Sequence, residues 1–254
     1  MYSQDILVAS CGSDVTSPIL SQDGQLFVVL GNSGNIMRVR DDRLFRSYST
    51  ATILSSAAFD YNRGVLYVAD MAQAAILGLR DRNQDVLVTE YEDKPLKGPH
   101  SLVCSRDGKI FFTDSGPLGA TGLHASKGSL FVITNGSSGQ HLLKPISYET
   151  LAYPTGIALS PNEKYVYVAE MCMNRVLRYF QSPEGVFQAS VFYQFCGGIG
   201  PSALACDNQG NIYVAHFEQR DGSQDGKISI LSSAGKLLDT VLTPGAEISG
   251  ICVR

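Results

Sequence analysis

A two-stranded hairpin pattern recurs five times along this chain of 254 residues and constrains its fold more than any other feature. Each copy places two runs of alternating apolar residues around a short turn of Gly, Pro, Asn and charged residues, which is typical of β-hairpins. The turn residues Gly24, Gly64, Gly108, Glu163 and Gly210 are equivalent and lie about 40 to 55 residues apart. The copies are residues 16–30, 56–70, 100–114, 155–170 and 202–216.

Two further strands are expected after each hairpin. The third strands are "GNIMRVR", "AAILGLR", "GSLFVIT", "NRVLRYF" and "GKISILS", and the fourth are "RLFRSYS", "DVLVTEY", "HLLKPIS", "VFQASVFY" and "LLDTVLT". Four short strands per repeat at this period are the signature of propeller blades. We therefore predict an all-β chain that forms a single β-propeller domain over residues 1–254.

The number of blades follows from what remains at the two ends of the chain. Five blades are complete, and "EISGICVR" (residues 247–254) has the pattern of the first strand of a sixth. "DILVAS" (residues 5–10) is a candidate for the outer strand of that blade. The prediction is a six-bladed propeller with an incomplete sixth blade, and an open sheet edge there would favour pairing with a protein partner.

Composition excludes several classes of function. The net charge is −4 and no basic run stands out, so we expect no nucleic-acid partner. No apolar run reaches the roughly 18 residues of a membrane helix, and the start of the chain lacks the pattern of a signal peptide. We expect no membrane association, a cytoplasmic location and six reduced cysteines.

Three stretches carry a resemblance to a known family. "GPHSLVCSRDGKIFFTDSGPLG", "YPTGIALSPNEKYVYVAEMCMNRVLRY" and "GPSALACDNQGNIYVAH" resemble the SMP-30/gluconolactonase/LRE family and its strictosidine synthase-like relatives. The resemblance implies a six-bladed propeller with a central site at one end of its channel. In the lactonase branch, such a site holds a divalent metal and hydrolyses lactones.

The family's metal ligands fall on uncharged residues here. Where the family has Glu in "GEGP", Asn in "PNG" and Asp in "PDG", this chain has "VTSP", "PTG" and "PSA". These motifs place Thr16, Thr155 and Ser202 at the family's ligand positions. The family's further Asn ligand corresponds to a position at or beside His100. The other blades add Ser56 and Ser249 to this central-channel ring. A hard cation needs carboxylates and a zinc site needs three or four ligands, so we predict no metal and no cofactor. Calcium would be expected only if the assignment of the ring were wrong.

Other candidate residues carry weaker signals. His100 is the one candidate catalytic base, but no carboxylate lies at a spacing that would orient it. Asp70, Asp114 and Glu170 each end the second strand of a blade, where acids commonly bond backbone amides. The long loop after the third copy begins with Asp114, Ser115 and Gly116, and it is expected to shape the entrance to the channel.

Two hypotheses about function follow. The first is a pseudoenzyme, a non-catalytic propeller that acts as an interaction or structural module in a larger assembly and meets a protein partner at the incomplete blade. The alternative is a lactonase-type hydrolase or a small-ligand binder that uses the central channel. The sequence leans toward the first, because the ring carries no formal charge. An open channel with His100 at its mouth would favour the second.

Overall fold

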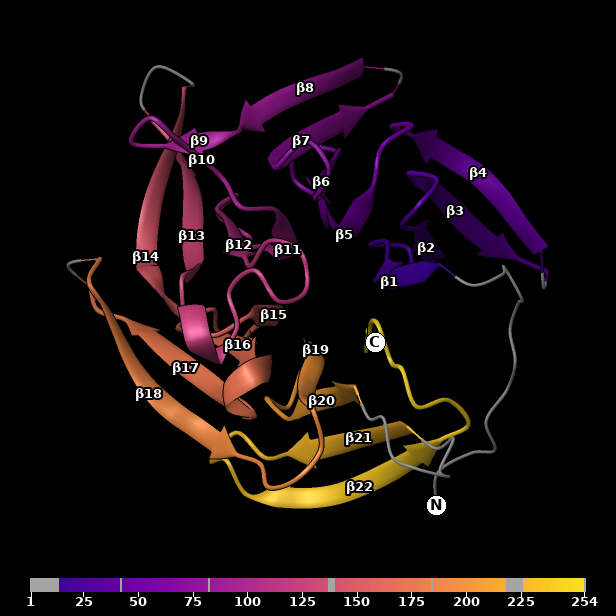
Figure 1. Ribbon diagram of the computed structural model, residues 1–254. Coiled ribbons are helices and arrows are strands. Elements are labelled where there is room, and N and C mark those ends of the chain that lie inside the picture. The colour runs from indigo at the N-terminus through magenta and orange to yellow at the C-terminus, as the bar shows by residue number, and fades with distance from the viewer. Residues whose placement is uncertain are drawn as a thin grey trace.

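The computed structural model describes residues 14–41, 43–81, 83–136, 140–183, 185–217 and 226–253. It confirms the predicted all-β propeller and its five complete blades, each a four-stranded antiparallel sheet whose strands pair in chain order. Figure 1 shows the blades arranged around a central axis. Their strands are β1 (Val15–Leu20), β2 (Leu26–Leu30), β3 (Asn35–Arg40) and β4 (Arg43–Ser49); β5 (Leu54–Asp60), β6 (Val65–Asp70), β7 (Ala75–Arg80) and β8 (Asn83–Val88); β11 (Pro99–Cys104), β12 (Ile110–Asp114), β13 (Gly128–Asn135) and β14 (His141–Leu151); β15 (Pro154–Leu159), β16 (Tyr165–Glu170), β17 (Arg175–Gln181) and β18 (Phe187–Gln194); and β19 (Gly200–Cys206), β20 (Ile212–Phe217), β21 (Gly226–Leu231) and β22 (Leu237–Thr243).

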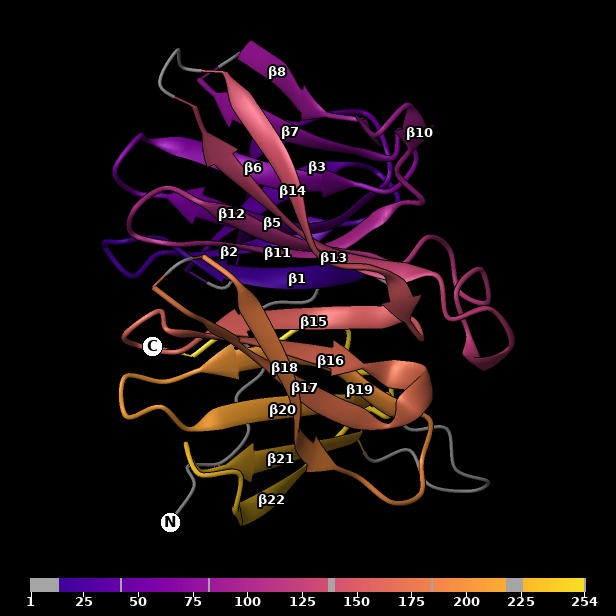
Figure 2. The same cartoon turned by 90° about the vertical axis from the view of Figure 1, so that its left-hand side faces the viewer.

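Short elements decorate the connections between these strands. A two-stranded ribbon, β9 (Glu90–Tyr91) and β10 (Lys94–Pro95), joins the second blade to the third. The 3₁₀ turns η1 (Leu123–Ala125) and η2 (Met171–Met173) lie in the β12–β13 and β16–β17 connections. Figure 2 shows the β12–β13 loop, in pink, projecting beyond one end of the strands. Neither described helix is long and apolar enough to cross a membrane.

Apolar residues of the middle strands bind each blade to the next. Successive side chains of a strand point to opposite faces of its sheet, so one strand can serve two interfaces. In β6, Leu66 and Val68 pack toward the first blade, whereas Tyr67 and Ala69 pack toward the third. Equivalent clusters join the third blade to the fourth and the fourth to the fifth. The hydrophobic core is therefore a series of interfaces between blades.

At the sixth position of the ring, the described residues form an inner segment and not a complete blade. Residues 247–253 run between β19 and β1, and Figure 1 shows this end of the chain beside β1. A bridge pairs Glu247 with Phe217, but the rest of the segment forms no strand, contrary to prediction. A strand needs a paired neighbour, and no described residues run beside this segment as a second strand. The candidate outer strand, residues 5–10, lies outside the described residues.

Candidate functional site

A cavity of about 390 Å³ opens at the end of the channel where the first strands begin. All six positions of the ring contribute to it, because each inner segment starts at this level. The ring residues Thr16, Ser55, His100, Thr155, Ser202 and Ser249 line it together with Asn32 and Tyr153, and the rest of the described lining is largely apolar. The volume lies within the ordinary range of small-molecule pockets, about 300 to 1,000 Å³.

A β-bulge in each complete blade directs one side chain to this cavity. The register between first and second strand shifts next to Thr16, Ser55, His100, Thr155 and Ser202. A bulge adds a residue on one strand and re-aims its side chain, which is why bulges are frequent beside functional sites. The starts of five different strands thus converge on one point near the axis.

The second blade contributes Ser55 to the cavity, where the sequence analysis placed Ser56. Ser56 is buried one residue further along the strand, in a narrower section of the channel of about 100 Å³. The cause is the bulge between Leu54 and Ser56, which turns Ser55 toward the cavity. Because Ser55 and Ser56 are adjacent and chemically identical, the sequence motif alone does not show which of them faces the cavity.

Four ring hydroxyls are committed to hydrogen bonds between blades. Each donates to the carbonyl that precedes the ring residue of the next blade, so the bonds follow one another around the axis. Such bonds occupy the hydroxyl protons and hold neighbouring blades together at the centre. The pairs are Ser55 Oγ to Pro99 O at 2.7 Å, Thr155 Oγ1 to Pro201 O at 2.9 Å, Ser202 Oγ to Ile248 O at 2.6 Å, and Ser249 Oγ to Val15 O at 2.5 Å.

Thr16 and His100 are the two ring residues outside this cycle. Thr16 turns its methyl group, rather than its hydroxyl, toward Gly31, where an added Cβ would lie 2.6 Å from Thr16 Cγ2. Thr16 Oγ1 and His100 Nδ1 are both buried, and neither has a hydrogen-bond partner among the described residues. A buried polar atom left without a partner is unfavourable by about 1 to 3 kcal/mol. Both atoms are therefore unsatisfied in the described structure, and a ligand in the cavity would reach them only if their side chains turned toward it.

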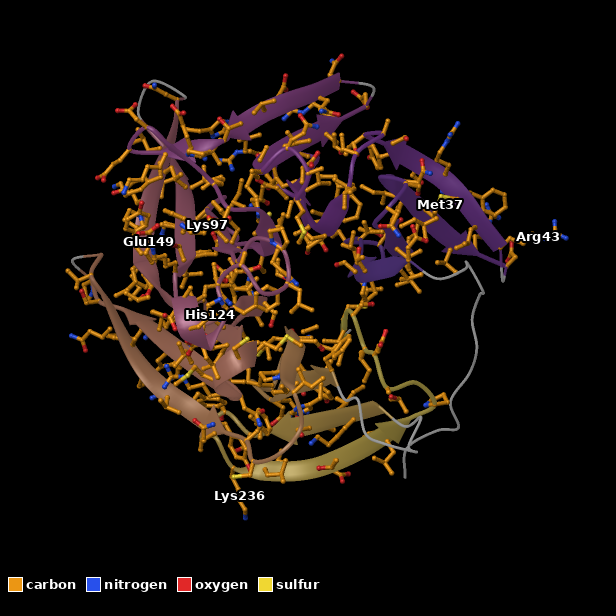
Figure 3. The ribbon with its side chains drawn as sticks, in the orientation of Figure 1. Met37, Arg43, Lys97, His124, Glu149 and Lys236 are labelled. Atoms are coloured by element: carbon orange, nitrogen blue, oxygen red, sulfur yellow. The ribbon has the colours of Figure 1, made fainter. Side chains whose placement is uncertain are left out.

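The loop before His100 fixes the position of that residue. The Asp114 carboxylate accepts hydrogen bonds from the backbone amides of Lys97 at 3.0 Å and Gly98 at 2.8 Å. Lys97 Nζ pairs with Glu149 at 2.8 Å, and Figure 3 shows these two side chains side by side. Burial raises the pKa of Asp114 even though both amides favour its charged form. The backbone that enters β11 is thus held at several points.

The imidazole of His100 is neutral at physiological pH. Burial lowers its pKa from the ordinary 6.5 to about 4. Its ring packs edge-on against Tyr153, with ring centroids 6.0 Å apart and planes at 78°. A neutral imidazole carries one donor and one acceptor nitrogen, so His100 can serve a carbonyl or a hydroxyl group of a ligand.

Tyr153 is a cavity residue that sequence reasoning missed. Its backbone has φ of +55°, a strained conformation for an aromatic residue, and such strain clusters at functional sites. Equivalent positions before Pro99 and Pro201 hold Gly98 and Gly200, also with positive φ. The departure from Gly-Pro to Tyr-Pro in one repeat was a signal in the sequence that could have identified it.

Asp114, Ser115 and Gly116, the predicted entrance residues, lie behind the cavity. All three are buried, and Gly116 N donates to Gly98 O at 3.0 Å. Leu118 is the residue of this loop that lines the cavity. Asp70 and Glu170 play the same kind of structural role as Asp114: Asp70 accepts from Gln73 N at 2.9 Å and Glu170 from Ala152 N at 2.7 Å. The acids at the strand ends thus hold backbone in place.

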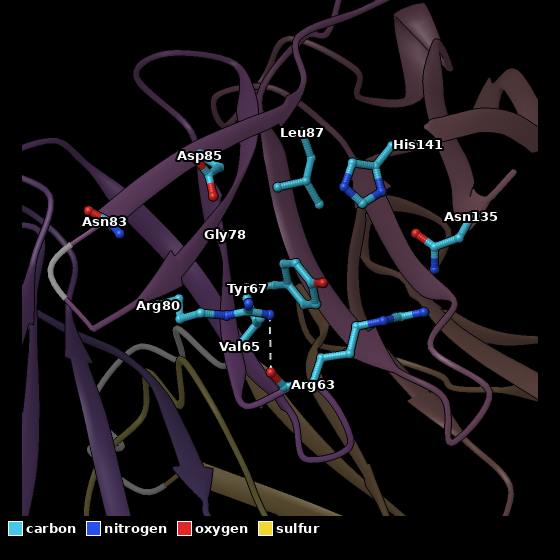
Figure 4. A pocket seen from close by; sticks show the side chains of 10 residues that line it. All are labelled: Arg63, Val65, Tyr67, Gly78, Arg80, Asn83, Asp85, Leu87, Asn135 and His141. Carbon is cyan, nitrogen blue, oxygen red and sulfur yellow. Dashed lines mark hydrogen bonds between the residues drawn. The ribbon is translucent and has the colours of Figure 1, made fainter. Parts of the chain in front are cut away.

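A second cavity, of about 530 Å³, lies on the side of the propeller between the second and third blades. Figure 4 shows Arg63, Arg80 and His141 among the side chains that line it. Arg63 Nη1 is 2.9 Å from the buried Asp60 carboxylate and also donates to Gly108 O. Arg80 donates to the backbone oxygen of Arg63 at 3.1 Å. The guanidinium of Arg63 is thus already engaged within the protein, which makes the central cavity the better candidate site.

The donors in the central cavity do not fit a hard divalent cation. They comprise the imidazole of His100, the amide of Asn32, the phenol of Tyr153 and five Ser or Thr hydroxyls, and four of those hydroxyls bond to backbone carbonyls. Carboxylates supply most of the binding energy for Ca²⁺, and the lining residues include none. In the part of the chain that the structure describes, no three His, Cys, Asp or Glu side chains are grouped so as to hold an ion.

Comparisons with known proteins agree on one family. The family model described as "SMP-30/Gluconolactonase/LRE-like region" matches residues 16–253. Lactonase drp35 of Staphylococcus aureus (strain USA300) is 27% identical over 241 residues, which cover 89% of this chain and 68% of the relative. Lactonase drp35 of Staphylococcus saprophyticus is 34% identical over 103 residues, which cover 39% of this chain and 30% of that relative.

Solved structures share the fold. The gluconolactonase XC5397 from Xanthomonas campestris superposes with a TM-score of 0.79 at 21% identity, covering 96% of this chain and 80% of that one. The calcium-binding protein regucalcin from Agrobacterium tumefaciens superposes with a TM-score of 0.72 at 16% identity, covering 94% and 77%.

Proposed function

This chain belongs to the SMP-30/gluconolactonase/LRE-like family of β-propellers, and on that basis we propose that its central cavity binds a small, uncharged lactone or related carbonyl compound without a divalent cation. Relatives of this chain are named lactonases, which supports a carbonyl compound of this class as the ligand. The charge-free ring supports the metal-independent mode.

The observation that carries the proposal is the pair of buried, unpartnered polar atoms, Thr16 Oγ1 and His100 Nδ1. A ligand that bonds to both removes the cost of leaving them unsatisfied, which favours binding. The Thr16 hydroxyl donates to a carbonyl oxygen, and the neutral imidazole of His100 bonds to a second polar group of the ligand. Tyr153 packs against that imidazole and limits its rotation.

Binding is proposed here rather than hydrolysis. Attack of water on a lactone needs a general base, and a base with a pKa of about 4 accepts a proton poorly at neutral pH. The residues that line the cavity include no carboxylate to orient His100 or strengthen it as a base. A role as a binding protein follows from the same uncharged ring that does not suit a metal.

The test is calorimetric titration of the purified protein with δ-valerolactone, in EDTA and in Ca²⁺, Mg²⁺, Mn²⁺ or Zn²⁺, with a thermal melt at each condition. We expect the same affinity in every condition, because the ring offers cations no carboxylate. Thr16→Val, which keeps the shape and removes the hydroxyl, should weaken binding about five- to ten-fold. Thr240→Val, at an exposed position of the outer strand β22 and outside the cavity, is the matched control for a threonine change and should leave the affinity unchanged.

Two results would contradict this function. Lactone turnover that requires a cation would show a working metal site. A clear rise in melting temperature on adding Ca²⁺ alone would likewise show that an ion binds the native state.

A second candidate function has its own supporting observation. Apolar clusters join four consecutive pairs of blades, but among the described residues none joins the fifth blade to the first. We propose that a protein partner packs at this sixth position, which would make the chain part of a larger assembly. Light scattering of the purified chain alone and with the candidate partner would detect a complex by its mass.

A further inference from the structure

Exposed apolar side chains gather at the mouth of the central cavity. Ile53, Leu118 and Ile199 line the cavity and yet are 46%, 74% and 41% exposed. They come from connections in three different parts of the chain. Exposed apolar groups at one place commonly mark an interaction site, whereas isolated ones need no explanation.

The two 3₁₀ turns extend this apolar rim. Leu123 of η1 is 65% exposed and Met173 of η2 is 38% exposed. A Cβ added to Gly122, the residue before η1, would lie 3.9 Å from Cys172 Sγ of η2, so the two turns lie against each other. The rim, defined by Ile53, Leu118, Leu123, Met173 and Ile199, therefore borders the cavity and continues away from it.

Polarity within the cavity changes from floor to mouth. Thr16 lines both this cavity and the narrower channel section below it, so it lies on the floor, and His100 occupies the equivalent ring position of its blade. The walls between floor and rim carry Leu54, Met71 and Met171 among other apolar groups. Among the described residues, no Asp, Glu, Lys or Arg lines the cavity, so a charged head group would meet no counter-charge from them.

We infer that the ligand is an amphiphile: an uncharged, hydrogen-bonding head held by Thr16 and His100, with a hydrocarbon tail that leaves through the mouth across the apolar rim. This inference rests on the proposed binding function and names the class of ligand. Burial of the tail against Leu118, Ile53 and Ile199 removes apolar surface of both molecules from water. Contacts at the rim then select ligands by the length of the tail, and contacts at the floor select them by the chemistry of the head.

The experiment uses a series of δ-lactones that differ only in alkyl side chain, from δ-valerolactone through δ-octalactone and δ-decalactone to δ-dodecalactone. Each methylene buried at the rim should raise the affinity about four-fold, and the gain should stop once the tail passes the rim. Leu118→Ser should flatten this dependence of affinity on chain length. Leu238→Ser is the matched control, because Leu238 is 53% exposed on β22, an outer strand, and does not line the cavity.

The outcomes separate the two proposals. Equal affinity for all members of the series would overturn the amphiphile inference and leave the proposed function standing. Absence of binding by every member, including δ-valerolactone, would overturn the proposed function and this inference with it. A concentration-dependent dimer that Leu118→Ser abolishes would assign the rim to a second copy of the chain and would also overturn the inference.

Discussion

At position 100 the ring has an imidazole where four other positions have a hydroxyl that bonds to the next blade. The folded protein keeps this imidazole neutral, with a pKa of about 4, whereas an unfolded chain binds a proton at about 6.5. Between these values the unfolded state holds more protons, so acidification from pH 6.5 to pH 4 lowers the free energy of unfolding. We expect His100→Asn to show a smaller decrease in the free energy of unfolding between pH 7 and pH 4.5, as measured by urea unfolding. His141→Asn, at an exposed histidine, should show the same decrease as the unchanged protein. If His100→Asn also showed that full decrease, the buried neutral state of His100 would be contradicted.

At the scale of the element, the inner strands are joined by hydroxyls that bond to the neighbouring strand. Ser202 is 7% exposed and bonds to Ile248 O at 2.6 Å, so Ser202→Ala leaves a carbonyl without its donor and should lower the free energy of unfolding by about 1 to 2 kcal/mol. Thr16→Val removes a hydroxyl without a described partner and should leave stability unchanged or slightly raised, although it weakens ligand binding. Urea unfolding of the two variants without ligand checks the contrast, and equal destabilisation would show that the Thr16 hydroxyl has a structural role.

At the scale of the whole molecule, residues 247–253 close the ring, and among the described residues they form no blade with further strands. Gly250 in that segment lies so close to β1 that an added Cβ would be 2.5 Å from Pro18 Cδ and 2.8 Å from Thr16 O. Gly250→Ala should therefore push residues 247–253 away and cost about 1 to 3 kcal/mol. Gly245→Ala is the control, because nothing lies within 4 Å of an added Cβ there. Denaturation midpoints and hydrogen exchange in β1 and β19 test this, and an unchanged Gly250→Ala midpoint would mean that the segment does not close the ring.

The sequence identified the blades because the relevant signals are local. Alternation in "KYVYVAE", with the turn at Asn162 and Glu163, predicts a hairpin without reference to the rest of the chain, and β15 and β16 form it. The third and fourth strands follow the same rule, since each must pair with the strand before it. The family resemblance added that the starts of the inner strands converge on a central site.

The sequence pattern alone did not show which side chains line that central site. The choice between Ser55 and Ser56 depends on a bulge in the pairing of β5 with β6, and Tyr153 reaches the cavity through a strained backbone conformation. The entrance loop shows the same limit: its first three residues are buried, and Leu118, further along, is the one that meets the cavity.

The sequence by itself determined an all-β propeller, the order of its strands and a ring of uncharged residues at its centre, because alternation and turn residues act over a few neighbouring positions. Only the tertiary structure decided which hydroxyls bond to the next blade and which polar atoms, Thr16 Oγ1 and His100 Nδ1, have no hydrogen-bond partner in the described part of the chain. The tertiary structure also decided which rim residues line the cavity, namely Ile53, Leu118 and Ile199. The physical reason is that these features join residues from different blades, and their contacts exist only once the ring has formed.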